Sequence, residues 1–227
     1  MLLSLLETST VGNKSLSKMN YSDYSTKLAS RFRDFLPVVI DIETSGIDAK
    51  TAAILEIAAL TIDCNAAGEF FIADSVHFHV EPFKGANFCP KSLEINGIDP
   101  YHPFRFAISE KLMLQNLFKF CSLAQKQTKC RKSVLVAHNA WFDLAFLNAA
   151  IVRCELEKKN PFHAFTCLDT ATMGMIAYGH SVLAEILKRA NIEFDHKAHH
   201  SALYDATKTA ELFCKILNSN AWPEPIS

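Results

Sequence analysis

The chain has 227 residues, of which 49% are hydrophobic and 21% are charged, which fits one folded domain and excludes a disordered protein. The formal net charge of −1 excludes a general attraction to nucleic acid, so a partner of that kind must be held by a local patch. Seven cysteines without a Cys-x-x-Cys pair favour reduced thiols and a cytoplasmic location.

The two ends of the chain differ in character from its middle. Residues 1–27 are polar and aperiodic, so we expect a loose tail there, then one domain over residues 28–218 and a second tail over residues 219–227. No apolar run approaches the roughly 18 residues of a membrane span, so we expect no membrane partner.

The segment Pro37–Thr44 runs from four apolar residues into two acids, Asp41 and Glu43. Its β-branched residues predict a buried strand, on which the two acids point to one face. A carboxylate pair at the end of a core strand is costly unless a charge compensates it, and divalent cations with oxygen ligands do so. The pattern alone leaves a second interpretation open, in which the strand ends in solvent and both acids are hydrated.

The next segments predict two further strands and a long connection. Residues 54–62 are mostly apolar, and residues 76–80 alternate, with His77 and His79 on one face. A metal pair is one interpretation of these histidines, but no third ligand is near, so we favour a half-exposed strand face. Residues 82–105 are rich in Pro, Gly and Asn and predict an irregular connection, which is usually functional at such a length.

An amphipathic helix is predicted over residues 110–127, and a buried strand over residues 133–137. The helix's apolar positions include Leu112, Leu114, Leu117, Phe118 and Cys121. A basic cluster lies between the two elements, and Arg31 and Arg33 could add to it. Its residues are either a solvated face or phosphate contacts, and the sequence leaves both open. They are Lys126, Lys129, Arg131 and Lys132.

A helix over residues 141–155 has an acid on its apolar stripe. Asp143 lies three residues before Phe146 and four before Leu147, so helical spacing puts all three on one face. A buried carboxylate costs several kcal/mol by order of magnitude unless it is paired or metal-bound. The alternative is that Asp143 stabilises the first helical turn, where the dipole favours acids.

The remaining elements complete an α/β pattern. We expect a short strand over residues 165–168, a helix from residue 169, and helices over residues 181–190 and 201–217. The buried stripe of the last helix is expected to contain Leu203, Ala206, Ala210, Phe213, Cys214 and Leu217. Strands followed by alternating strands and helices predict a central mixed sheet flanked by helices.

Before the last helix, His200 precedes Asp205 by five residues. The two side chains converge only if His200 lies in the loop ahead of the helix, where it would be a candidate general base. Zinc bound by His196, His199 and His200 is the alternative, but no cysteine has metal-site spacing.

Four acids and one imidazole together suit Mg²⁺, with Mn²⁺ as the alternative, better than zinc. Two such ions roughly 3.5–4 Å apart would clamp the attacking and leaving oxygens of a phosphoryl displacement, with His200 as the base for the attacking water. The sequence therefore predicts phosphodiester hydrolysis. The expected metal ligands are Asp41, Glu43, Asp143 and Asp205.

Three motifs in this order resemble those of the DEDD exonuclease superfamily, in its histidine-type branch. They are Asp41-Ile42-Glu43-Thr44, His138-Asn139-Ala140-Trp141-Phe142-Asp143 and His200-x4-Asp205. The linking segments Arg31-Phe32-Arg33, His77-Phe78-His79-Val80-Glu81-Pro82 and Asn96-Gly97-Ile98-Asp99-Pro100 also resemble the bacterial ribonuclease T family, and the likeness covers about residues 28–218.

The resemblance implies a ribonuclease H-like fold and a 3′→5′ exoribonuclease. Such an enzyme trims single-stranded 3′ ends of stable RNAs in tRNA end turnover and maturation and in rRNA 3′ maturation. It releases nucleoside 5′-monophosphates and also acts on DNA 3′ ends. It further implies a homodimer in which a basic patch of one subunit grips the substrate entering the site of the other.

The resemblance also implies which residues contact RNA. Phe142 and Phe165 match positions that stack on bases, with core packing as the alternative. Ile47 and Ile95 stand where the family can carry phenylalanine, and Lys91 where it can carry glutamate, so the base preference stays open. The residues expected in the basic patch are Arg31, Arg33, Lys126 and Lys132.

Two other functions share parts of this pattern. A proofreading DNA exonuclease carries the same motifs but would bind a polymerase subunit instead of a second copy of itself. A non-catalytic RNA-binding module on this fold would be expected to lack one acid or the histidine, and all five are present.

Overall fold

The computed structural model describes residues 27–195 and 201–219. Within them a helical turn over residues 27–31 leads into a five-stranded sheet in the order β3-β2-β1-β4-β5. The β1–β2 and β2–β3 pairs are antiparallel, whereas β1–β4 and β4–β5 are parallel, so the expected mixed sheet is confirmed. The strands are β1 (Phe35–Thr44), β2 (Ile54–Cys64), β3 (Phe70–His79), β4 (Lys132–Ala137) and β5 (Phe162–Asp169).

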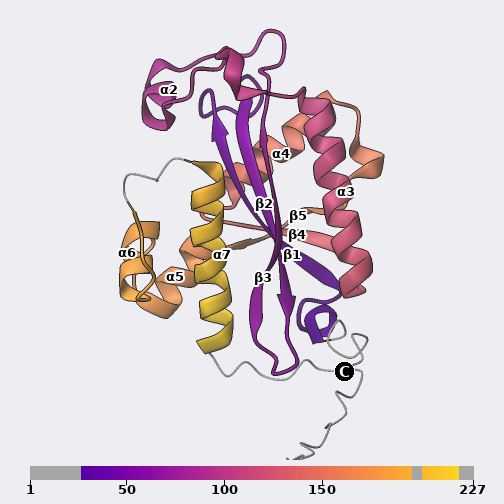
Figure 1. The fold of residues 1–227 in the computed structure, drawn as a ribbon, viewed down its shortest axis with the longest axis vertical. Helices are drawn as coiled ribbons and strands as arrows, with labels where there is room; N and C mark the ends of the chain where they lie inside the picture. Colours follow the sequence, from indigo (N-terminus) through magenta and orange to yellow (C-terminus); the bar gives the residue numbers. More distant parts are fainter. Residues whose placement is uncertain (1–26, 196–200, 220–227) are drawn as a thin grey trace, which may run out of the picture.

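Helices cover both faces of this sheet. Figure 1 shows α3 and α4 on one side, and α7 with α5 and α6 on the other. No helix in the described ranges is long and apolar enough to cross a membrane. The helices are α2 (Pro90–Asn96), α3 (Glu110–Thr128), α4 (Trp141–Arg153), α5 (Thr170–Tyr178), α6 (Leu183–Arg189) and α7 (Ala202–Ser219), with 3-10 turns η1 (Pro103–Arg105) and η2 (Glu157–Lys159).

The alternation of β1 divides the core into two layers. Val38 and Ile40 are buried in the layer that contains α3 and α4, while Val39 is buried in the layer that contains α7. Because side chains alternate along a strand, Asp41 and Glu43 follow Val39 onto the α7 side. The strand pattern thus turns the two acids toward the helix that carries Asp205.

Several expectations about local structure were wrong. The connection over residues 82–105 is not wholly irregular, because it contains α2 and η1. Pro90 is in the first turn of α2, and Gly97 ends this helix with a φ of 65°, which suits glycine. The third strand begins at Phe70, six residues before the predicted start.

Two leucines expected in buried stripes are instead exposed. Leu112 on α3 is 43% exposed and Leu203 on α7 is 37% exposed, because each lies at the edge of its helix's apolar face. The other helix and strand positions agree with the predictions to within a few residues. The tails expected over residues 1–27 and 219–227 fall almost wholly outside the described residues.

Candidate active site

Asp41 and Glu43 lie at the carboxyl end of β1. In the antiparallel pairing with β2, Asp41 faces Ala58 and Glu43 faces Glu56, and the register then shifts between Glu43 and Thr44. This irregularity ends the regular ladder directly after the second acid. The two carboxylates are therefore held on rigid backbone at the point where the chain leaves the sheet.

Asp205 completes a three-carboxylate cluster. It lies in the first turn of α7 and is only 5% exposed, because α7 packs its buried face against the sheet. One oxygen from each of Asp41, Glu43 and Asp205 lies within 4.8 Å of the others. A strand and a helix that are distant in the sequence thus bring three acids to one point.

Asp143 approaches the cluster from α4. It is 4% exposed, and its carboxylate accepts a hydrogen bond from the backbone N–H of Ile42, which lies between Asp41 and Glu43 on β1. Its placement on the buried stripe of α4 confirms the helical spacing argument. All four predicted acids are therefore neighbours.

The turn that delivers Asp143 is fixed by Asp169, a residue that the sequence argument used only as a helix start. Asp169 Oδ1 accepts hydrogen bonds from the backbone N–H groups of Asn139 at 2.8 Å and Ala140 at 3.3 Å. Asp169 also caps α5 through Thr172. One carboxylate at the end of β5 thereby orients the starts of two helices.

Crowding of the acids changes their protonation. Burial, together with the charges of Asp143, Glu43 and Asp205, raises the pKa of Asp41 well above its ordinary value. Burial, Asp205 and Glu56 raise the pKa of Glu43 to about 8. Burial also raises the pKa of Asp143, and the charge of Glu43 adds to the effect. Without a compensating positive charge, Glu43 would hold a proton at neutral pH.

This donor set fits hard divalent cations. The cluster offers only carboxylate oxygens, which Mg²⁺ and Mn²⁺ prefer, and a bound cation would compensate the crowded negative charge that raises the pKa of Glu43. A nitrogen- or sulphur-preferring ion would find no suitable partner among these four residues. The geometry therefore agrees with a divalent-metal site.

The sequence argument missed two residues that lie beside Glu43. The side chain of Asn96, at the end of α2, donates a hydrogen bond to Glu43 and another to the carbonyl oxygen of Thr44 at 3.0 Å. Glu56 faces Glu43 across the β1–β2 pair and is itself 7% exposed. Glu56 could have been noticed in the sequence as an acid inside a mostly apolar strand. Asn96 could not, because the Asn96-Gly97 pair indicates only a turn.

The predicted general base, His200, lies outside the described residues. The described chain resumes at Ser201, whose carbonyl oxygen accepts a hydrogen bond from the N–H of Asp205 at 2.9 Å. Ser201 thus takes part in the start of α7, which fits its predicted position at the helix start. His196 and His199, considered for zinc, also lie outside the described ranges.

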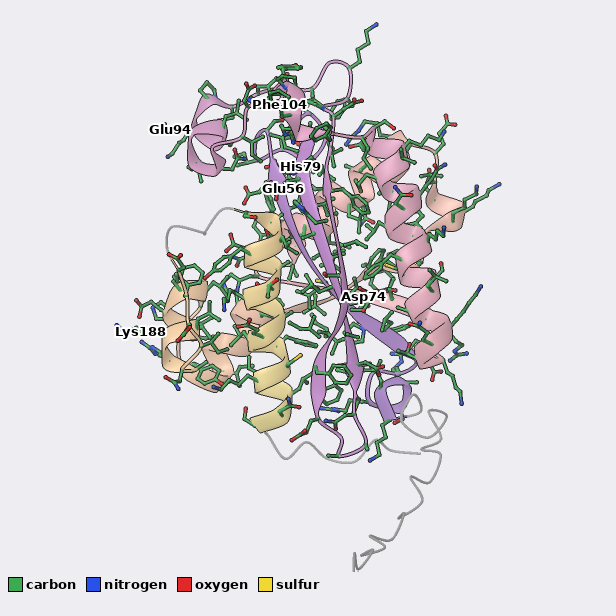
Figure 2. All side chains as sticks on the ribbon, viewed as in Figure 1. Glu56, Asp74, His79, Glu94, Phe104 and Lys188 are labelled. Atoms are coloured by element: carbon green, nitrogen blue, oxygen red, sulfur yellow. The ribbon has the colours of Figure 1, made fainter. Side chains whose placement is uncertain are left out.

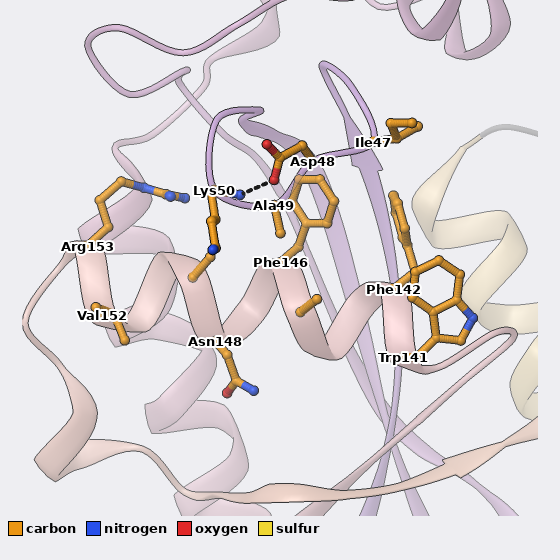
Figure 3. A pocket seen from close by; sticks show the side chains of 12 residues that line it. Ile47, Asp48, Ala49, Lys50, Trp141, Phe142, Phe146, Asn148, Val152 and Arg153 are labelled. Atoms are coloured by element: carbon orange, nitrogen blue, oxygen red, sulfur yellow. Dashed lines mark hydrogen bonds between the residues drawn. The ribbon is translucent and has the colours of Figure 1, made fainter.

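An apolar groove of about 720 Å³ runs along α4. Figure 3 shows Ile47, Phe142 and Trp141 at one end of it and Arg153 at the other. Ile47 is 85% exposed, while the ring of Phe142 packs on Phe146 with ring centres 4.8 Å apart. Since Asp143 directly follows Phe142, this end of the groove adjoins the carboxylates.

Phe165 does not line this groove. It lies on β5, 80% exposed, with its ring edge-on to His163 at 4.6 Å. An exposed ring on a strand is not core packing, so that alternative is wrong for Phe165. Phe142 is half-buried and has both a packed side and an open side.

The basic residues lie at the opposite end of β1 from the acids. Lys132 begins β4 and pairs with Phe35, the first residue of β1. The backbone N–H of Arg131 donates to the carbonyl oxygen of Asp34 at 2.8 Å, which joins this end of β4 to the start of β1. From Phe35 to Asp41, six residues at about 3.3 Å each span about 20 Å. The group, here called the basic end, consists of Arg31, Arg33, Lys126 and Lys132.

Comparison with known proteins agrees with this architecture. A family model described as an exonuclease, RNase_T, matches residues 38–213. The nuclease domain of 3′hExo, a DEDDh family member bound to rAMP, superposes with a TM-score of 0.65 at 19% identity, covering 82% of this chain and 92% of that one. E. coli exonuclease I in complex with a dT13 oligonucleotide gives 0.59 at 16% identity, with 82% of this chain and 41% of that one covered.

Relatives of much higher identity carry the name ribonuclease T. The protein of Shewanella denitrificans is 50% identical over 203 residues, covering 88% of this chain and 89% of that protein. The protein of Vibrio vulnificus is 48% identical over 210 residues, covering 90% and 96%. Fold and site therefore define a nuclease of the exonuclease class with a ribonuclease H-like fold. Within that class, the chain belongs to the ribonuclease T family.

Proposed function

We propose that this protein is a metal-dependent 3′→5′ exoribonuclease that trims single-stranded 3′ ends of stable RNAs by two-metal phosphodiester hydrolysis. The observation that carries the proposal is the meeting of four buried or half-buried carboxylates from β1, α4 and α7. So many adjacent acids destabilise the folded protein, and such local conflicts are expected at functional sites. Membership of a nuclease family supports a catalytic role for them.

Asp41, Glu43, Asp143 and Asp205 would hold two Mg²⁺ ions, with Mn²⁺ as the alternative. When bound, the ions supply Lewis-acid activation of the attacking water and stabilise charge on the phosphoryl oxygens. The protein's own contribution is rigidity: β1 and α7 fix three ligands, and the bond from Ile42 N–H fixes the fourth. His200 would take the proton from the attacking water, a role that follows from the family motif.

The terminal base would enter at the end of the groove beside the carboxylates. Phe142 would stack on it, and Ile47 would supply an aliphatic contact across from that ring. Base stacking on an aromatic ring contributes roughly 1–3 kcal/mol and tolerates any sequence. Phe165 would contact a base further from the cleaved bond, because it lies outside this groove. Ile95 and Lys91 on α2, near Asn96, would modify the base preference.

The basic end would act across a homodimer. In one chain it lies about 20 Å along β1 from the carboxylates, so the two groups do not both contact a 3′-terminal nucleotide held at the carboxylates. A second chain that brings its Arg31, Arg33, Lys126 and Lys132 to the mouth of the first chain's site would solve this. The short single-stranded tail needs few phosphate contacts, which agrees with the net charge of −1.

The natural substrates would be tRNA and rRNA precursors in the cytoplasm, with DNA 3′ ends also accepted. Ribonuclease T relatives at about half identity support an RNA substrate, while the oligonucleotide bound to exonuclease I belongs to that protein.

One experiment tests the proposal. The purified protein is incubated with a 5′-labelled stem-loop RNA that carries a single-stranded 3′ tail, first with Mg²⁺ and then with EDTA. We expect a ladder that shortens from the 3′ end, stops near the duplex and disappears in EDTA. A matched blunt-ended stem-loop should resist. RNA binding without shortening would instead favour the binding module, and shortening of DNA tails alone would favour the proofreading exonuclease.

A further inference from the structure

A second cluster of metal-binding side chains lies on β2 and β3. Glu56 pairs in register with His79 on the neighbouring strand, and His77 is two residues earlier on the same face. The Nε2 atom of His77 is 2.6 Å from Glu56 Oε1, and the Nδ1 atom of His79 is 3.9 Å from Glu56 Oε2. Figure 2 labels Glu56 and His79 at adjacent points of the two strands. The expectation that no third ligand lies near the histidines was therefore wrong.

The donors in this cluster differ from those of the carboxylate site. It offers two imidazole nitrogens and one carboxylate oxygen, all within 4.8 Å of one another. Mg²⁺ prefers oxygen alone, whereas two histidines and a glutamate are a ligand set that Zn²⁺ takes in proteins. The chemistry therefore selects a borderline transition-metal ion.

The spacing of the donors is close to what one ion needs. Two ligands at 2.0–2.1 Å from a tetrahedral Zn²⁺ ion lie about 3.3 Å from each other. The contact from His79 to Glu56 would shorten from 3.9 Å, and that from His77 would lengthen from 2.6 Å. Both changes are well under 1 Å, and both histidines are only half-buried, so their rings have room to adjust.

A simple Glu–His hydrogen bond does not account for the whole cluster. It satisfies His77, but Nδ1 of His79 is buried and makes no hydrogen bond to any residue that the structure describes. Buried polar atoms in native proteins are normally satisfied by protein, water or an ion. The orphaned nitrogen faces the same carboxylate that His77 contacts.

The carboxylate of Glu56 still has lone pairs available to bind a metal ion. Its carboxylate accepts a hydrogen bond from the backbone N–H of Ala202, which uses one of about four lone-pair positions. Arg105, the nearby guanidinium, donates instead to the carbonyl oxygens of Pro100, at 2.9 Å, and Leu55. The carboxylate therefore keeps free positions toward the two histidines.

We propose that Glu56, His77 and His79 form a second metal site that takes Zn²⁺ or a similar ion and is distinct from the carboxylate site. The two sites are adjacent, because Glu56 faces Glu43 across the β1–β2 pair. A cation held by Glu56 would compensate negative charge beside Glu43, so occupancy of one site influences the other.

Cobalt provides a direct test, since Co²⁺ replaces Zn²⁺ and absorbs visible light strongly when it is four- or five-coordinate. One equivalent of Co²⁺ is added to the full chain in excess Mg²⁺, which fills the carboxylate site. We expect strong visible bands that Zn²⁺ abolishes, with about one ion bound per chain. His77→Gln and His79→Gln should each weaken cobalt binding by about 100-fold. Loss of a residue that only supports a ligand already weakens metal binding by about 10–100-fold, and loss of a ligand should cost at least as much.

Two controls make the result specific to this cluster. Asp205→Asn removes a ligand of the carboxylate site and should leave the cobalt bands within about threefold in affinity. His180→Gln removes a histidine elsewhere and should leave them unchanged. Circular dichroism verifies that each variant is folded. Weak bands typical of octahedral Co²⁺, or strong bands that survive in the doubly substituted His77→Gln, His79→Gln chain, would overturn the proposal, whatever the outcome of RNA cleavage.

Discussion

The two ends of β1 carry opposite charges in opposite settings. At the carboxyl end, buried or half-buried acids from β1, α4 and α7 crowd together, and the pKa values of Asp41, Glu43 and Asp143 are raised. At the basic end, Arg33, Lys126 and Lys132 are exposed and come from separate elements that meet around the start of the strand. Buried charges must have a partner to be tolerated, whereas exposed ones cost little and gain little. This contrast is the basis for the proposal that one end carries out the chemistry and the other holds phosphates.

The largest effect is expected at the buried end. Asp205→Asn should reduce RNA turnover to background, because it removes the α7 ligand while its buried amide keeps the shape of the side chain. Folding should be preserved, since the lost charge is one that repels Asp41 and Glu43. Turnover is followed by release of labelled mononucleotide, and circular dichroism reports the fold. Full activity in a folded variant would show that the carboxylates are not the metal site.

A smaller but still large effect is expected for the base. His200→Ala should lower kcat by about 10²–10⁴-fold, the usual contribution of a general acid–base residue, with little change in RNA binding. Single-turnover cleavage and filter binding separate the two quantities. The residual rate should rise with pH as hydroxide replaces the missing base. Loss of RNA binding with an unchanged single-turnover rate would assign His200 to substrate contact instead.

The crowded acids also predict a pH-dependent stability of the metal-free protein. The pKa of Glu43 is about 8 in the folded chain against 4.5 ordinarily, so the folded state holds the proton more tightly. The stabilisation is complete below about pH 4.5 and is lost as pH rises through about 8. Thermal unfolding in EDTA should show a loss on the order of a few kcal/mol across this window.

Mg²⁺ should remove this decline, because the cation takes over the charge compensation that protons provide. The matched control is Glu43→Gln, which should make the decline in EDTA shallower but not abolish it, because burial still raises the pKa of Asp41 and Asp143. A metal-free protein that grows steadily more stable from about pH 5 to about pH 8 would contradict the crowding argument.

A smaller effect is expected in the groove. Phe142→Ala should weaken binding of a 3′ end by roughly 1–3 kcal/mol, the value of one stacked base, and should raise KM more than it lowers kcat. Val152→Ala, at the far side of the same groove, is the control and should change neither. Steady-state kinetics on RNA tails that differ in the last base would measure KM and kcat for each variant. Equal losses for the two variants would place the base elsewhere along α4.

The sequence identified three of the four acids because each depends on a local period, and it identified Asp205 through its spacing from His200. Alternation in β1 placed Asp41 and Glu43, and helical spacing placed Asp143 on its buried stripe. The cluster around Glu56 could not be predicted in this way. Residue 56 meets residue 79 only through the register of β2 and β3, which depends on the turn between them and on packing with α7.

The α2 helix shows a different kind of failure. Its start and stop signals, Pro90 and Gly97, were present in the sequence, but the surrounding Pro, Gly and Asn residues favoured a loop. The exposed position of Leu203 depends on which face of α7 the sheet covers. That exposure is set by tertiary packing, which local patterns do not encode.

Subunit mixing tests most directly whether the two ends of β1 serve one reaction from two chains. One variant carries Asp205→Asn with an intact basic end, and the other carries Arg33→Ala and Lys132→Ala with intact acids. A third, Lys188→Ala on α6, controls for loss of an exposed cation elsewhere. The basic-end variant alone should cleave slowly at moderate salt, with a shallower dependence of binding on salt. Mixing the two should restore cleavage. In a mixed dimer, the intact carboxylates of one subunit are served by the intact basic end of the other. Activity that stays at the average of the two separate variants would contradict the account.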